Sequence, residues 1–483
     1  MTQTAELTGG ESSTKSTVAR WAPQAGLWAL GAVILFLYSS LWRPIWFDEF
    51  LHYAMGGMTL DYALKTIDYT TIETNHGQTG VYMLLDYLLM QVFGASAVAL
   101  RLPSLIAAAV MLGAAVTFLR LRGFGFAWRY LALIAFAGHA FLMYFSGEAR
   151  PYMALAGSTV AALAYYQYDV ADRRRVWPIA LGVFGICVGA LMHPYIVYLL
   201  VLILPFSVWM AVRDGRVQWQ VRDVVRFLNP VLLAVGAALF VAVGLLTYLR
   251  RVARFDYDPL EWMGKSWALT VEKAFSDHFG NPTNAWFWLV AVALVTLIAL
   301  AVSRFTCSRS ILPPLVLILI GVVSSISVSV VSIMRTYWIF DRQWVAGMAL
   351  VTLGSVWFFA ELLRDARVRR STVLAVPAYV FITLTLVSGA FTLLNQATAM
   401  NDARVAYQQF TEETRTMDEL RPTQVNDDNA FIYAANVNVA RGGPVWPMFV
   451  DWYDNLAGMR PEFREKNPSW TGFLGDQRTV NNG

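Results

Sequence analysis

The stretch APQAGLWALGAVILFLYSSLW (residues 22–42), followed at once by RPIWFDEF (43–50), decides how this chain folds. The first part is long and apolar enough to cross a bilayer as one helix. It exceeds the apolar core of a signal peptide and lacks a small-residue cleavage site, so we expect it to remain as the first membrane span. Two adjacent carboxylates, Asp48 and Glu49, then stand at the membrane boundary. Because charge is costly beside hydrocarbon, such a pair indicates a functional site.

The composition of the chain is typical of a membrane protein. Of 483 residues, 57% are hydrophobic and only 14% are charged, whereas about 25% are charged in an average soluble domain. Abundant Trp, Tyr and Phe suit the aromatic belts of a multi-pass protein. The net charge of +4 is small and indicates no nucleic-acid partner. The two cysteines, Cys187 and Cys307, make no disulfide framework.

Apolar runs of membrane-spanning length recur along the chain. We predict about eleven spans, over residues 22–42, 98–119, 130–147, 151–168, 177–193, 195–212, 228–249, 284–303, 311–334, 343–360 and 372–394. The segment 76–93 is apolar on average but carries polar residues, His76 and Asp86 among them. We predict that this segment lies along the membrane interface.

The distribution of Lys and Arg predicts the orientation. With a cytoplasmic N-terminus and an interfacial segment 76–93, the cytoplasmic loops hold the cations of residues 15–20, 120–129, 173–175, 213–226, 304–309 and 364–370. This arrangement satisfies the positive-inside rule, and a crossing by 76–93 would place nearly all of these cations outside. We therefore predict an inner (plasma) membrane protein whose active site and C-terminus face the periplasmic or external side.

Three regions follow from this topology. Residues 1–21 form a cytoplasmic tail, residues 22–394 a transmembrane catalytic domain with external loops 43–97 and 250–283, and residues 395–483 an external C-terminal region. In the last region we predict a helix near 402–420 and short strands at 431–439 and 446–453. The predicted fold class is an all-α polytopic membrane protein with interfacial juxtamembrane helices and a small external α/β region.

Polar side chains gather on the predicted external face. They are Asp48, Glu49, His52 and His76 of the first loop, Glu148 and Arg150 of FSGEARPY, His193 and Tyr195 of MHPY, Arg250 and Arg251, and Tyr337 and Arg342 of RTYWIFDRQW. A carboxylate can accept the proton of an acceptor hydroxyl. Arginines can hold a phosphate and stabilise charge on a departing one. A site at the membrane edge suits a lipid whose phosphate lies at headgroup level, such as a polyprenyl-phosphate sugar.

Structural explanations for several of these residues stay open. Arg150 could pair with Glu148, and Arg342 could be a snorkelling anchor at the end of a span. Arg250 and Arg251 could begin a solvated loop, and His193, before Pro194, could be a hydrogen-bonded histidine at a helix end. The adjacent carboxylates Asp48 and Glu49 are the hardest to explain structurally.

Five sequence elements resemble the GT-C class of multi-pass glycosyltransferases. They are WFDEF (46–50), NHGQTGVYMLL (75–85), FGASAVALRLPSL (93–105), SGEARPYMAL (146–155) and LMHPYIVYLL (191–200). The pattern is similar to the bacterial protein O-mannosyltransferases and lipid A aminoarabinose transferases. The resemblance covers about the first 210 residues, and the later half matches only in layout, through the long loop 250–283 and Arg342.

The resemblance implies a role for individual residues. Asp48 would be the base that activates the acceptor, with Glu49 beside it, and Glu148, Arg150 and His193 match positions near the lipid-phosphate site. His76 falls where relatives carry a His or Lys before a Pro-Pro pair, but this chain has Gly77-Gln78 there.

The function predicted from these residues is transfer of a sugar from polyprenyl phosphate to a hydroxyl on a glycan, lipid or protein acceptor, with inversion of configuration. Arg250, Arg251 and Tyr337 would join the donor site. No feature of the sequence requires a cofactor, although the two adjacent carboxylates leave open the possibility of a bound divalent metal. One alternative is a ligase or polymerase that transfers a lipid-pyrophosphate-linked oligosaccharide. Another is a transporter of lipid-linked sugars, which the absence of charge in the span 311–334 disfavours.

Overall fold

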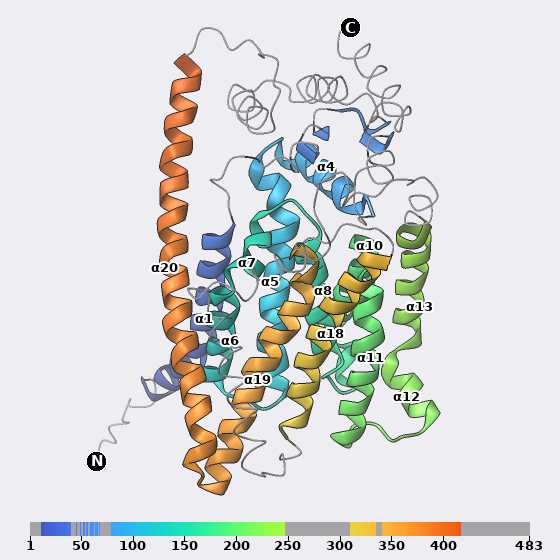
Figure 1. The fold of residues 1–483 in the computed structure, drawn as a ribbon, viewed down its shortest axis with the longest axis vertical. Coiled ribbons are helices and arrows are strands. Elements are labelled where there is room, and N and C mark those ends of the chain that lie inside the picture. Colours follow the sequence, from blue (N-terminus) through green and yellow to red (C-terminus); the bar gives the residue numbers. More distant parts are fainter. Residues whose placement is uncertain are drawn as a thin grey trace, which may run out of the picture.

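A bundle of helices makes up the part of the chain that the computed structural model describes. The described residues are 11–39, 79–246, 310–334 and 341–416, with 45, 49, 52–53, 55–56, 58–61, 63–65 and 67 of the first loop. Regular structure within these ranges is helical, without a strand. Most of the long helices run roughly along one axis (Figure 1). The prediction of an all-helical multi-pass protein is confirmed for these ranges, and the predicted strands at 431–439 and 446–453 lie outside them.

The first half of the bundle contains both long and broken helices. Its elements are α1 (Glu11–Tyr38), α4 (Val81–Phe93), α5 (Ala97–Leu121), α6 (Phe126–Gly138), α7 (Ala140–Tyr144), the 3₁₀ turn η1 (Phe145–Gly147), α8 (Tyr152–Tyr165) and the 3₁₀ turn η2 (Asp172–Arg174). Helix α6 and the α7–η1 segment meet at a bend of 79°. The predicted span 130–147 is therefore a broken helix.

The second half contains the longest helix. Its elements are α9 (Val176–Gly182), the π-helix η3 (Val183–Val188), α10 (Gly189–Met192), α11 (Ile196–Arg213), α12 (Val221–Leu228), α13 (Pro230–Leu239), the π-helix η4 (Phe240–Leu245), α18 (Leu312–Met334), the 3₁₀ turn η6 (Asp341–Trp344), α19 (Val345–Arg369) and α20 (Thr372–Thr416). Every predicted span except 284–303, which lies outside the described residues, overlaps a straight or broken helix in its described part. Among the described residues, 5 helices are long and apolar enough to cross a membrane, or up to 7 with each bent pair taken as one span. The count of about eleven stays a prediction.

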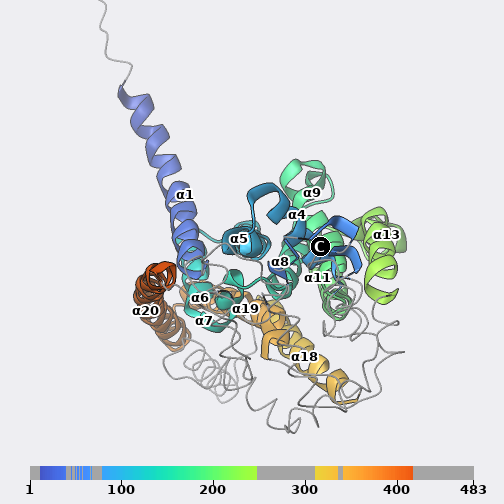
Figure 2. The ribbon, with the colours of Figure 1, turned by 90° about the horizontal axis from the view of Figure 1, so that it is seen from above.

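Two boundaries of the predicted regions do not coincide with helix ends. Helix α1 begins at Glu11, inside the segment expected as a tail, and its N-terminal part projects away from the bundle (Figure 2). Helix α20 continues without a break past residue 394 to Thr416, so its 45 residues span about 68 Å. This length exceeds a bilayer, and α20 extends beyond the other helices at the end where α4 lies (Figure 1). The extension from residue 395 to Thr416 contains no Gly or Pro, and its polar residues do not by themselves end a helix.

Helix α4 is too short to cross a membrane. Its 13 residues extend about 20 Å, against a hydrocarbon core of about 30 Å. It lies obliquely across one end of the bundle (Figure 1). The length and the position of α4 both favour the interfacial arrangement predicted for segment 76–93.

Helix α19 is the centre of the bundle. Its apolar window is wholly buried, and it packs against α6, α8, α18 and α20. The α18–α19 contact depends on glycine, because a Cβ added at Gly347 would lie 2.5 Å from the Gly321 carbonyl oxygen. Small residues of this kind let the backbones of membrane helices approach closely.

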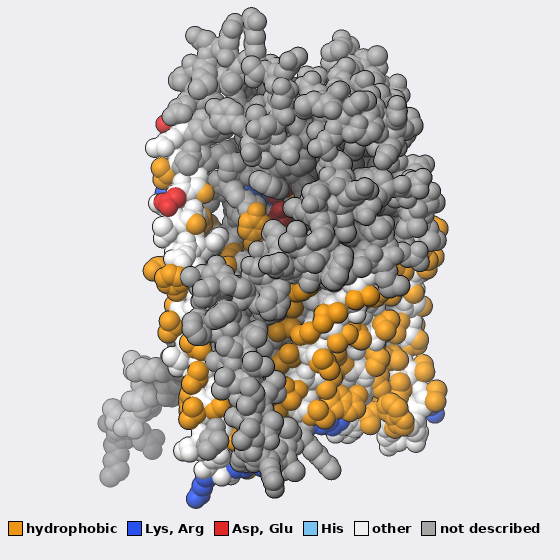
Figure 3. Space-filling view, in the orientation of Figure 1, with side chains coloured by type: hydrophobic (Ala, Val, Ile, Leu, Met, Phe, Trp, Pro, Cys, Tyr) orange, Lys and Arg blue, Asp and Glu red, His pale blue; other side chains and the backbone are white. Residues whose placement is uncertain are grey.

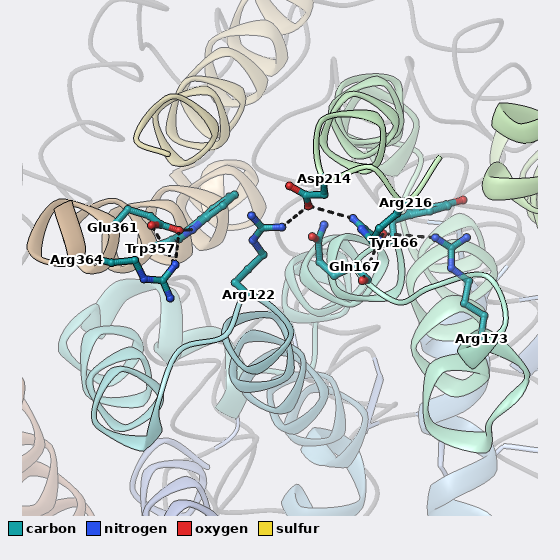
Figure 4. Close-up of polar contacts among 9 residues, drawn as sticks. All are labelled: Arg122, Tyr166, Gln167, Arg173, Asp214, Arg216, Trp357, Glu361 and Arg364. Carbon is teal, nitrogen blue, oxygen red and sulfur yellow. Dashed lines mark hydrogen bonds and ion pairs between the residues drawn. The ribbon is translucent and has the colours of Figure 1, made fainter. Parts of the chain in front are cut away.

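Cationic loops close the end of the bundle opposite α4. Apolar side chains cover the described surface in a broad band, and Lys and Arg side chains appear at its lower edge (Figure 3). Between the helix ends, Arg122 Nη1 lies 2.5 Å from Asp214 Oδ2, and Arg216 Nη1 donates to the Gln167 carbonyl at 3.0 Å (Figure 4). Four basic loops lie at this end, as expected if it is the cytoplasmic one. They are the loops 120–129, 173–175, 213–226 and 364–370.

Candidate functional site

A buried ion pair anchors the first loop at the α4 end of the bundle. Glu49 and Arg101 are both fully buried, with Arg101 Nε 3.0 Å from Glu49 Oε1 and Arg101 Nη2 2.7 Å from Oε2. The Ala149 backbone N–H also donates to Oε1, at 2.8 Å. A bidentate guanidinium–carboxylate pair is strong and fixes orientation. Both oxygens of Glu49 are therefore engaged in holding three segments together.

Local sequence signals place Arg101 at this point. Gly94 has a positive φ of 81° and ends α4, and the Ser96 hydroxyl accepts a hydrogen bond from Ala99 N to cap α5. Arg101 and Ser104 then lie three residues apart on one face of the first turns of α5. Helix α5 thus begins with a buried cation directed at Glu49 and a buried hydroxyl directed at the segment that carries Glu148 and Arg150.

Ser104 fixes the backbone of the GEARP segment. Its hydroxyl lies 2.7 Å from the Glu148 carbonyl and 3.0 Å from the Arg150 carbonyl, and 2.6 Å from the Tyr82 hydroxyl of α4. Glu148 is extended and Pro151 precedes the first turn of α8, where a fixed φ and a missing N–H cost nothing. The turn carrying Glu148 and Arg150 is therefore held rigidly between α4, α5 and α8.

A second buried polar pair joins the first loop to α4. His52 Nδ1 lies 2.6 Å from Asp86 Oδ2, and both side chains are almost inaccessible. Burial raises the pKa of Asp86 well above its usual range; nearby Glu49 raises it further, and Arg150 opposes the shift. We interpret the pair as a short hydrogen bond that positions the loop.

His193 lies where one broken helix ends and α11 begins. A residue before proline is disfavoured in the α region, and His193 is extended at φ −154°. Its Nδ1 accepts the Tyr195 backbone N–H at 3.2 Å, which confirms the helix-end explanation for this nitrogen. Nε2 is fully buried and has no hydrogen-bond partner in the part of the chain that the structure describes. Since Nδ1 accepts, the neutral ring carries its proton on Nε2.

Tyr152 brings His193 and Arg342 together. Its ring centroid lies 5.9 Å from that of His193, and the Arg342 guanidinium carbon lies 5.3 Å from the Tyr152 ring. The Tyr195 ring also contacts His193, with a centroid distance of 4.6 Å and an angle of 45° between the rings. The fold therefore places one cation and one neutral N–H donor beside the Tyr152 ring at the start of α8, two residues after Arg150 in the chain. This grouping can bind an anion.

Burial makes the stability of the His193 region sensitive to acid. Burial lowers the pKa of His193 from 6.5 to about 3. The unfolded chain therefore binds this proton more readily, so stability is complete above about pH 6.5 and is lost as the pH falls towards 3. Between pH 7 and pH 4 we expect a loss of about 3 kcal/mol from this residue.

The measurement is the apparent melting temperature in detergent against pH, for the native protein and His193→Asn. Asn keeps the acceptor for the Tyr195 N–H but does not titrate. The native protein should lose more stability between pH 7 and pH 4 than the variant. Parallel pH profiles would contradict the buried neutral state of His193.

The structure therefore brings part of the predicted site together. Glu49, Glu148, Arg150, His193, Tyr195 and Arg342 all lie at the α4 end of the bundle. The predicted residues Asp48, His76, Arg250, Arg251 and Tyr337 lie outside the described residues. No individual role was predicted for Arg101, His52 or Asp86. Arg101 is a charge within a predicted span, which is the signal that could have identified it.

Metal ligation is not evident in the described ranges. No three His, Cys, Asp or Glu side chains come together there as metal ligands. The divalent metal left open by Asp48 and Glu49 stays a prediction.

Comparisons with known proteins give structural neighbours only. No family model and no curated protein match the chain. The oligosaccharyltransferase AglB from Archaeoglobus fulgidus, in complex with an inhibitory peptide and a dolichol-phosphate, is 14% identical over 86% of this chain, with a TM-score of 0.43. The match covers 60% of AglB, so this chain spans about three fifths of that protein's length.

A second neighbour comes from Cupriavidus metallidurans. Its ArnT in the apo state is 14% identical over 95% of this chain and 75% of that one, with a TM-score of 0.43. ArnT bound to undecaprenyl phosphate is 15% identical over 90% and 78%, with a TM-score of 0.42. Both neighbours are GT-C membrane glycosyltransferases, the class that the sequence motifs resemble. At these TM-scores the similarity does not decide the function.

Proposed function

We propose that the chain is a membrane glycosyltransferase that moves a sugar from polyprenyl phosphate to an acceptor hydroxyl at the external face. The observation that carries the proposal is the grouping of Arg342 and His193 around Tyr152, two residues after Arg150 in the chain, at the bundle end where the first loop is anchored. A buried N–H donor that has no partner among the described residues, close to a guanidinium group, favours a phosphate ligand.

The proposed chemistry is a single displacement. Asp48 takes the proton of the acceptor hydroxyl, whose oxygen forms a bond to the anomeric carbon. The bond from that carbon to the phosphate oxygen breaks on the opposite face, so configuration inverts. Polyprenyl phosphate leaves as a weak base and needs no general acid, and Arg150 and Arg342 offset its charge.

Other residues would position these groups. Glu49 is engaged by Arg101 and Ala149, so the base role falls to Asp48 alone. Ser104 holds the carbonyls on both sides of Ala149 and so fixes the turn that carries Arg150. His76, Arg250, Arg251 and Tyr337 stay predicted donor-binding residues.

The distribution of buried charge disfavours a transporter. Within the described helices, the buried Asp, Glu and Arg side chains are Glu49, Asp86, Arg101 and Glu148 at one end of the bundle, and Arg173 and Glu361 at the other. Transporters place such groups near the bilayer midplane.

The test is turnover of a panel of radiolabelled polyprenyl-phosphate sugars by the purified protein in nanodiscs, read as release of polyprenyl phosphate. We expect release with at least one monophosphate donor. Turnover confined to pyrophosphate-linked oligosaccharides would replace the proposal with the ligase alternative. Accumulation of donor in the other leaflet without release would favour a transporter.

His193→Asn should raise the KM for the active donor about 10-fold, because it removes the Nε2–H donor, worth about 1.5 kcal/mol to a charged group. His139→Asn is the matched control, since His139 is also buried and its Nδ1 also accepts a backbone N–H, from Leu142. An equal change in KM in both variants would remove His193 from the phosphate site.

A further inference from the structure

A basic pocket opens at the end of the bundle opposite the candidate site. Its volume is about 540 Å³, and it lies between η2 and the junction of α12 with α13. Arg173, Arg174 and Arg226 supply the cationic part of the lining, and Ile179, Val183 and Leu232 the apolar part. The pocket is thus divided into a charged half and an apolar half.

The Arg173 side chain forms part of the pocket wall and is held there by several contacts. It is only 6% exposed, and its Nε donates to the Tyr168 carbonyl at 3.2 Å while Nη1 donates to the Phe227 carbonyl. The guanidinium also lies 4.3 Å from the Phe227 ring and 4.6 Å from the Tyr165 ring. Figure 4 shows it directed at Tyr166, beside the polar contacts that close this end. Its charge is therefore fixed in place.

The three arginines lack acidic partners. None of them forms an ion pair with a carboxylate in the described ranges, and neighbouring Asp172 pairs with Arg175 at 3.0 Å. Three cations around one pocket repel each other, and the wall that holds Arg173 restricts its access to water. An anion inside the pocket would relieve this repulsion.

The apolar half continues onto the outer surface of the bundle. Ile179 and Val183 are 48% and 42% exposed along α9 and η3, and Val231 and Val235 are 72% and 47% exposed along α13. Exposed apolar side chains of this kind suit contact with the bilayer in a multi-pass protein. A ligand with a phosphate at the arginines could lay hydrocarbon along them.

We propose that this pocket binds the phosphate headgroup of an anionic phospholipid from the adjacent leaflet, with the acyl chains along α9 and α13. Basic pockets between membrane helices are suited to such headgroups. The volume accommodates a headgroup and excludes a macromolecule. The site is separate from the sugar-transfer site, since the two lie at opposite ends of the bundle.

The test is lipid binding by native mass spectrometry of the full chain purified in detergent, titrated with phosphatidylglycerol or with phosphatidylcholine. Arg174→Gln/Arg226→Gln removes two exposed pocket cations and leaves buried Arg173 in place. Arg367→Gln/Arg370→Gln is the matched control, because it removes two exposed cations at the same end of the bundle but outside the pocket. Arg174→Lys/Arg226→Lys keeps the charge.

We expect saturable binding of phosphatidylglycerol that weakens about 10- to 30-fold in the Gln pocket variant and is retained in the control and the Lys variant. Equal weakening in both Gln variants would overturn the pocket in favour of general surface charge. Displacement of the lipid by inorganic phosphate would overturn the lipid in favour of a soluble anion. Melting temperatures of all variants exclude a loss of binding through unfolding, and no outcome depends on sugar transfer.

Discussion

Asp48→Asn should lower the rate of sugar transfer about 10²- to 10⁴-fold. Asn cannot accept the proton of the acceptor hydroxyl, so the nucleophile would remain a neutral alcohol. The adjacent carboxylate cannot replace it, because the Arg101 guanidinium and the Ala149 N–H engage both oxygens of Glu49 in a fully buried position. The measurement is the initial rate of polyprenyl phosphate release at saturating donor and acceptor.

Asp61→Asn is the matched control for this variant. Asp61 lies in the same loop, is 72% exposed and pairs with Lys65 at 2.7 Å in a surface contact. Its replacement should leave the rate unchanged. If Asp48→Asn retains the native rate, the base is another group and the proposed displacement loses its first step.

Arg101→Leu should lower the free energy of unfolding by about 3–5 kcal/mol, because it leaves the Glu49 carboxylate buried without its cation. Lys should not restore the native stability, since an ammonium group cannot reproduce the two parallel N–H···O bonds of the guanidinium. The measurement is thermal unfolding in one detergent at pH 7, together with the yield of monodisperse protein.

The double variant Glu49→Gln/Arg101→Leu separates loss of the charge pair from damage to the fold. Gln keeps an acceptor for the Ala149 N–H and removes the uncompensated charge. We expect the double variant to be more stable than Arg101→Leu, since replacing both partners of a buried pair is often nearly neutral. A double variant as unstable as the sum of the two single variants would show that the pair carries no coupling energy.

The helices could be predicted from the sequence wherever the hydrophobicity of a segment alone determines its position and length. Runs such as 98–119 and 195–212 match α5 and α11 within one or two residues, because long apolar runs must satisfy their backbone hydrogen bonds internally in lipid. The break before α11 is also readable, because Pro194 disfavours a helical His193. The 79° bend at His139 has no proline beside it and was not predicted.

The candidate site was predictable only as a set of residues at one end of the bundle. Three segments could be identified because charged and polar groups are rare beside apolar runs. They are WFDEF with its two carboxylates, the GEARP turn and the MHPY turn. Arg101 and Glu49 are 52 residues apart, and nothing in either segment specifies that they pair. The grouping of His193 and Arg342 around Tyr152 likewise depends on helices that meet only in the folded bundle.

The sequence by itself determined that the chain is a multi-pass helical protein with its short basic loops on one side. The physical reason is local, since transfer of apolar runs into lipid and retention of cations outside it act on each segment separately. Only the tertiary structure decided that Glu49 is a buried anchor and that three arginines, without a carboxylate partner among the described residues, line a pocket at the far end. Both outcomes depend on which side chains the packing of the helices brings within a few ångströms of one another. The burial and the charge pairing of a residue are set by these neighbours and not by its type.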